Sequence, residues 1–115
     1  MRNDKDNLIV NLSLEFALGI IDYSEILEEK KKFIVARQLL RSGTSIGANI
    51  REAQNAESRL DFIHKMKIAA KEADETKYWL MLCNMSDKYP KNQILPDKLQ
   101  DIINILSKII SSSKM

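Results

Sequence analysis

The chain has few of the residues that crosslink, interrupt helices or bind metals. It holds one cysteine, two prolines, three glycines and one histidine among 115 residues. A single cysteine excludes an internal disulfide, and the first residues lack the apolar segment of a secretory signal, so we expect a cytoplasmic protein. No apolar run approaches the roughly 18 residues that a membrane span needs. Because strand-like alternation is also scarce, the sequence favours an all-helical fold.

Length and composition indicate a single domain spanning residues 1–115. Hydrophobic residues make up 44% of the chain and charged residues 30%, as in ordinary globular proteins. A chain of this length has room for one hydrophobic core. The formal net charge of +2 does not by itself indicate nucleic-acid binding.

Apolar residues recur at helical spacing in four segments, at about 6–29, 33–55, 58–87 and 96–112. Asp4 or Asp6 is available to cap the first helix, whose apolar stripe includes Ile26. Ser58 and Asp61 resemble a capping box, and Pro96 fits the first turn of the last helix. Short connections favour antiparallel neighbours, so we predict an antiparallel up-down-up-down four-helix bundle.

The segment from Arg41 to Ala53 reads RSGTSIGANIREA and is rich in small residues. Gly43 and Gly47 each cost about 1 kcal/mol relative to alanine inside a helix, which indicates close approach to another backbone. Glu72 lies at the margin of the apolar face of its helix. We expect it to bond across the bundle to Ser45, Asn49 or Arg41, the alternative being that it points to solvent. The predicted packing and register residues are Ser42, Gly43, Ser45, Gly47, Asn49 and Glu72.

Charge is distributed unevenly along the chain. Residues 1–29 hold seven acidic and two basic residues, whereas residues 30–77 hold eleven basic and six acidic ones. On the second helix, Arg37, Arg41 and Arg51 fall within an arc of roughly 80°. This basic stripe either pairs with the acidic first helix or a neighbouring subunit, or binds phosphates. The candidate nucleic-acid-binding residues are Lys30, Lys31, Lys32, Arg37, Arg41 and Arg51.

Residues that could support catalysis or ligand binding are sparse. Asp61 and His64 have the spacing of a di-iron ligand pair, but such a site needs a second pair and further glutamates. Cys83 lies at a core position and is expected to pack as a small hydrophobe. There is no phosphate loop after a strand and no nucleophile elbow. We therefore predict no enzyme activity, no metal, no cofactor and no small-molecule substrate.

Some apolar residues fall outside the predicted core stripes, among them Leu14, Ile21 and Trp79. Aromatic residues are enriched at subunit interfaces, so Trp79 is a candidate subunit contact. The alternative is that Trp79 only covers the core of its own bundle.

The blocks Arg41–Ala53, Phe62–Ala69 and Lys71–Leu80 resemble the signature of the four helix bundle protein family, also called the 23S rRNA intervening-sequence protein family. The resemblance spans about residues 8 to 110 in matching order. It implies a left-handed antiparallel bundle that assembles as a homopentamer and has no enzymatic activity. Some members are encoded within insertions in bacterial 23S rRNA genes.

A related branch comprises the accessory variability determinant proteins of diversity-generating retroelements, which are strongly basic pentamers that bind a reverse transcriptase and nucleic acid. The small net charge separates this chain from that branch. Two functions therefore stand side by side: a non-enzymatic oligomer that binds RNA or DNA, and a protein-interaction scaffold with no nucleic-acid role.

Overall fold

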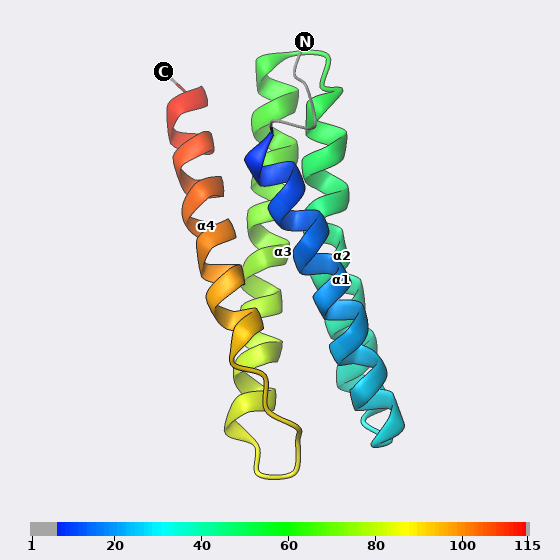
Figure 1. Ribbon diagram of the computed structural model, residues 1–115. Coiled ribbons are helices and arrows are strands. Elements are labelled where there is room, and N and C mark those ends of the chain that lie inside the picture. Colours follow the sequence, from blue (N-terminus) through cyan, green and yellow to red (C-terminus); the bar gives the residue numbers. More distant parts are fainter. Residues whose placement is uncertain (1–6, 115) are drawn as a thin grey trace.

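The computed structural model describes residues 7–114, which form four α-helices and no strand (Figure 1). They are α1 (Leu8–Glu29), α2 (Phe33–Gln54), α3 (Arg59–Met85) and α4 (Ile94–Ser113). Successive helices run in opposite directions (Figure 1). The predicted up-down-up-down bundle is confirmed, and each helix begins and ends within two residues of its predicted bounds.

The four helices pack in the ring α1, α2, α3, α4, each with its backbone closest to those of its two neighbours. The α1/α2 pair therefore lies on the opposite side of the core from the α3/α4 pair. The α2 helix has extensive contacts on both sides, whereas the seam between α1 and α4 is the smallest of the four. The contact that closes the ring, between the first and the last helix, is therefore also the smallest one.

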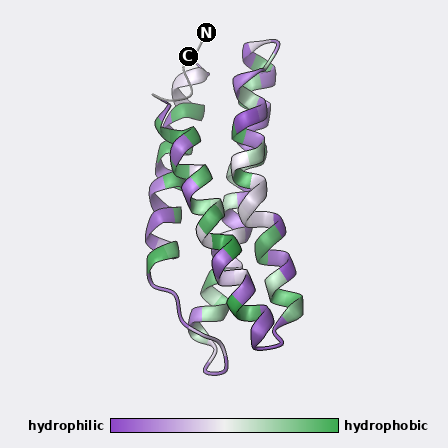
Figure 2. Cartoon of the chain, turned by 45° about the vertical axis from the view of Figure 1, so that its right-hand side comes forward, coloured by the Kyte–Doolittle hydropathy of each residue, from purple (hydrophilic) through white to green (hydrophobic). Residues whose placement is uncertain are grey.

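Hydrophobic residues recur along each helix between hydrophilic ones (Figure 2). The largest fully buried side chains come from all four helices: Phe16, Ile9, Ile20, Leu27, Leu39, Ile46, Ile50, Met66, Leu80, Leu99, Ile102 and Leu106. Ile26 was expected in this core but is 42% exposed. The first residues of α4 lie opposite Gly19, about two turns earlier on α1, so α4 does not reach far enough to cover Ile26.

Side-chain caps set the helix starts. Asn7 Oδ1 accepts a hydrogen bond from the amide of Val10, so Asn7 caps α1; Asp4 and Asp6 lie outside the described residues. Ser58 Oγ accepts from the amide of Asp61 at 3.0 Å, as expected. The Asp61 carboxylate reaches back to the amide of Glu57 rather than to that of Ser58, which makes the cap a variant of the capping box.

The start of α4 lies two residues before its predicted position. Asn92 Oδ1 accepts from the amides of Ile94 and Leu95, at 3.0 and 2.8 Å, and satisfies donors that the helix itself leaves open. Pro96 lies in the first turn, as expected.

The loop between α3 and α4 is fastened to the corner between α1 and α2. The hydroxyl of Tyr23 donates to the carbonyl oxygen of Pro90 at 2.6 Å, and Lys32 lies over the ring of Tyr89, 5.0 Å from its centroid. Burial, reinforced by the adjacent Cys83, raises the pKa of Tyr23 well above its ordinary value. Tyr23 is therefore a neutral hydrogen-bond donor that anchors this loop.

Candidate functional site

The small-residue segment of α2 brings its backbone close to α1. A Cβ atom added at Gly43 would lie 2.8 Å from Cγ1 of Ile20, and one added at Gly47 would lie 3.3 Å from Oγ of Ser13. The close approach expected at the two glycines is therefore present, and the neighbour is another helix of the same chain.

The other edge of this segment faces α3. Ser42 Oγ and Thr76 Oγ1 form a buried hydrogen bond of 2.9 Å between the two helices. Ser45 and Asn49 instead form hydrogen bonds within α2. The hydroxyl of Ser45 donates to the backbone carbonyl oxygen of Arg41, and the side-chain amide of Asn49 donates to the backbone carbonyl oxygen of Ser45. The buried hydrogen bond between α2 and α3 thus involves Ser42 and neither Ser45 nor Asn49.

Glu72 does bond across the bundle, and its partner is Arg41. Arg41 Nη1 lies 3.3 Å from Glu72 Oε2, and Nη2 also contacts Glu75. The indole nitrogen of Trp79 donates to the same Glu75 oxygen at 3.0 Å. The Arg41 side chain is 48% exposed, so solvent screens these ion pairs. Arg41 therefore pairs with α3 of its own chain, not with the acidic α1.

The six candidate cations do not form one patch. Lys30, Lys31 and Arg37 are exposed at the α1–α2 corner and one turn beyond it, whereas Lys32 contacts the Tyr89 ring. Arg51 is exposed about 21 Å farther along α2 than Arg37, at 1.5 Å per residue.

Trp79 is half-buried and packs against the core. Its ring meets that of Tyr78 edge to face, with centroids 5.5 Å apart. The packing within the chain is thus present, and the subunit contact stays a prediction.

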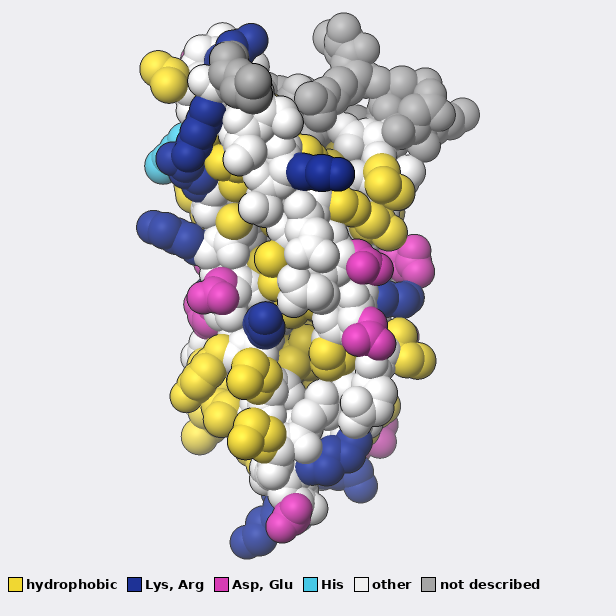
Figure 3. Space-filling view, turned by 90° about the vertical axis from the view of Figure 1, so that its left-hand side faces the viewer, with side chains coloured by type: hydrophobic (Ala, Val, Ile, Leu, Met, Phe, Trp, Pro, Cys, Tyr) yellow, Lys and Arg dark blue, Asp and Glu magenta, His cyan; other side chains and the backbone are white. Residues whose placement is uncertain are grey.

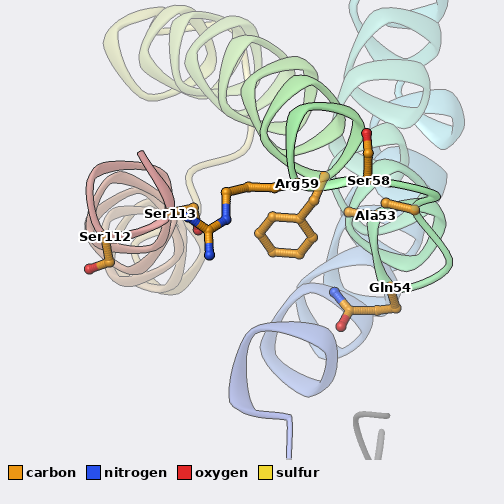
Figure 4. A pocket seen from close by; sticks show the side chains of 8 residues that line it. Ala53, Gln54, Ser58, Arg59, Ser112 and Ser113 are labelled. Carbon is orange, nitrogen blue, oxygen red and sulfur yellow. The ribbon is translucent and has the colours of Figure 1, made fainter. Parts of the chain in front are cut away.

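A recess with a volume of about 520 Å³ lies at the α2–α3 connection. It is lined by Ala53, Gln54, Ala56, Ser58, Arg59, Phe62, Ser112 and Ser113. Arg59 extends from α3 toward Ser113 of α4 (Figure 4). Because Arg59 is the one charged residue in this lining, the recess has no acid–base pair.

The reactive residue types are dispersed in residues 7–114. No three side chains of the metal-binding types His, Cys, Asp and Glu gather there into a group that could hold a metal ion. Cys83 is buried, and burial raises the pKa of its thiol, which keeps it protonated. None of the helices in this range is long and apolar enough to cross a membrane.

The sequence analysis singled out Leu14 and Ile21 as apolar residues outside the core stripes, but it did not predict that they belong to one of two apolar areas on opposite sides of the bundle. The first, which we call the α1/α2 face, consists of Leu14, Ala17, Leu18, Ile21 and Leu40. The second, the α3/α4 hollow, has a volume of about 320 Å³. Its apolar lining residues are Leu80, Met81, Met85, Pro96 and Leu99.

A signal for the first area was present in the sequence. Leu14, Leu18 and Ile21 follow one another at intervals of four and three residues, which is a second helical stripe beside the core stripe of α1. The sequence contains no comparable pattern for the hollow. The hollow depends on the distance between α3 and α4, which the periodicity of a single helix does not encode.

The comparisons with known proteins agree with this architecture. The model of the 23S rRNA-intervening sequence protein family matches residues 5–112. The chain is also similar to a crystal structure of a protein of unknown function from the S23 ribosomal protein family of Bacteroides thetaiotaomicron. The two share 44% identity with a TM-score of 0.85, over 90% of this chain and 98% of the other. No curated protein matches the chain.

Proposed function

Because the chain belongs to the 23S rRNA-intervening sequence protein family, we propose that it is a non-enzymatic cytoplasmic protein that works as a homo-oligomer. The observation that carries this proposal is the amount of large apolar surface that the single bundle leaves uncovered. Exposed large hydrophobic residues are Leu8, Leu14, Leu18, Ile21, Ile26, Phe33, Ile34, Leu40, Leu60, Tyr78, Met81, Leu82, Met85 and Ile94. Contiguous exposed apolar patches mark interaction sites in soluble proteins.

The mass in solution tests this proposal. Light scattering after size-exclusion chromatography should give a multiple of the 13.2 kDa chain mass. The homopentamer that the sequence resemblance implies would have a mass of about 66 kDa, five times 13.2 kDa. A mass of 13.2 kDa at micromolar concentration would refute the proposal.

Nucleic-acid binding is the second candidate function, and the observation that favours it is a small basic cluster at the α1–α2 corner. Lys30, Lys31 and Arg37 are exposed there and form no ion pair with the described part of the chain. Repetition of this cluster around an oligomer would multiply the number of phosphate contacts. Affinity for a labelled rRNA fragment should then fall steeply with salt.

Glutamate substitutions at Lys30, Lys31 and Arg37 should abolish this binding and leave the oligomer intact. Arg41→Ala is the matched control, because Arg41 is engaged with α3. Absence of binding by the unsubstituted protein at about 50 mM salt would exclude this function and leave the scaffold role.

A further inference from the structure

The α1/α2 face is an exposed apolar surface. Leu14, Leu18 and Ile21 of α1 are 54%, 57% and 39% exposed, and Leu40 of α2 is 42% exposed. Beside Leu14, a groove of about 160 Å³ between α1 and α2 is lined by Val10, Ser13, Ala17, Thr44, Gly47, Ala48 and Arg51.

The α3/α4 hollow is a larger recess than this groove. Its volume of about 320 Å³ compares with the roughly 150 Å³ that admits a benzene molecule into an apolar protein cavity. It therefore has room for aliphatic side chains from outside. Figure 3 shows hydrophobic side chains gathered low on the face that α3 and α4 present. Of the residues that line the hollow, Met81 is 50% exposed and Met85 is 76% exposed; Tyr78, three residues before Met81 on α3, is 56% exposed.

The position of the two surfaces decides which kind of contact can cover both. They lie on opposite sides of the core, because α2 packs between α1 and α3 on one flank of the ring and α4 packs between them on the other. A two-fold dimer would pair one surface with itself and leave the other exposed. A head-to-tail contact covers both surfaces on every copy, and it continues until a ring closes or a filament forms.

Charge also favours the head-to-tail contact. Every charged residue of α1 is acidic: Glu15, Asp22, Glu25, Glu28 and Glu29. Lys77 lines the hollow, and Lys67 and Lys71 follow it along the exposed side of α3 together with Asp74. The α4 wall carries exposed charges of both signs, Asp97 and Asp101 beside Lys98 and Lys108. An α1 helix therefore meets an excess of lysines over acids around the hollow, and only like charge at another α1.

We propose that the hollow between α3 and α4 receives Leu14, Leu18 and Ile21 from the α1/α2 face of a second copy of this chain. This contact rests on the proposed homo-oligomer and specifies how its subunits meet. Met81, Met85 and Tyr78 of one copy then surround the leucines of the next, and Lys77 lies near the acidic end of the neighbouring α1.

Two single variants test the contact. Leu18→Arg blocks the face, and Met81→Arg blocks the hollow; both side chains are at least half exposed, so the bundle should still fold, as judged by circular dichroism. Each variant alone should be a 13.2 kDa monomer. Ile34→Arg is the matched control, because Ile34 is 76% exposed on α2 and lies outside both surfaces. This control should keep the mass of the unsubstituted protein.

Mixing the two variants gives the decisive result. Each retains the surface that the other has lost, so the mixture should form a dimer of about 26 kDa, twice 13.2 kDa, and nothing larger. A mixture that stays monomeric, or single variants that keep the full oligomer mass, would overturn the contact and leave the homo-oligomer standing. A monomeric unsubstituted protein would instead refute the homo-oligomer itself. If either arginine variant misfolds, Leu14→Ser and Met85→Ser replace the pair with the same expected outcomes.

Discussion

Gly43 and Gly47 lie one turn apart in the interior of α2, yet alanine should have different effects at the two positions. Either substitution gains about 1 kcal/mol of helix propensity. At Gly43 the new methyl group would lie 2.8 and 2.9 Å from the two γ carbons of Ile20, whose side chain is fully buried. At Gly47 the nearest atoms are the hydroxyl and carbonyl oxygens of Ser13, at 3.3 and 3.4 Å.

Overpacking of a tight core costs about 1–3 kcal/mol, which exceeds or cancels the propensity gain at Gly43. We therefore expect Gly43→Ala to lower the free energy of unfolding by about 0–2 kcal/mol. Gly47→Ala needs only a small shift and should change stability by about 0 to +1 kcal/mol. The difference between the two variants isolates packing, because helix propensity is common to both.

Urea unfolding followed by far-UV circular dichroism, at one fixed protein concentration, measures both variants. A double-mutant cycle with Ile20→Ala sharpens the comparison. Ile20→Ala alone should cost about 2–5 kcal/mol, but less when Gly43→Ala supplies a methyl group to the same space. Equal effects of the two alanines, or strict additivity with Ile20→Ala, would refute the close approach of α2 to Ile20.

Three further predictions concern polar groups. Thr76→Val should cost about 1–3 kcal/mol of stability in urea, because it leaves the buried Ser42 hydroxyl unpaired, and Ser42→Ala should relieve that cost when both are combined. Ser58→Ala should cost about 1 kcal/mol by loss of the α3 cap, and an unchanged urea midpoint would contradict this. Because the folded-state pKa of Tyr23 is raised, its contribution is complete below about pH 10 and is lost as the pH rises further. The unfolding free energy of Tyr23→Phe should therefore fall less steeply above pH 10 than that of the unsubstituted protein.

Helical periodicity was enough to predict the bundle and most of its core. The apolar stripes on the four segments fix which side of each helix turns inward. Phe16, Ile46, Met66 and Leu106, one from the stripe of each helix, are all fully buried. Ile26 was misplaced because periodicity describes a single helix, whereas its burial depends on where α4 begins.

Which neighbour each side chain meets was harder to predict. Gly43 faces α1 and Ser42 faces α3, although the two are adjacent in sequence. The order of helices around the core decides this, and a pattern within one helix does not encode it. Arg37 and Arg41 lie close together on a helical wheel, yet Arg41 turns to the glutamates of α3 while Arg37 stays exposed.

The small seam between α1 and α4 has a consequence for motion within the native state. Segments with fewer buried contacts open at lower free energy than the whole molecule, so α4 should exchange its amide hydrogens faster than α2. Pro96 and Leu99 of α4 form one wall of the α3/α4 hollow, so the hollow disappears whenever α4 detaches. A neighbouring copy that occupies the hollow would hold α4 in place, because a ligand that binds only the closed form stabilises it by mass action. Amide protection in α4 would then rise with protein concentration, and each subunit would complete the fold of the one beside it.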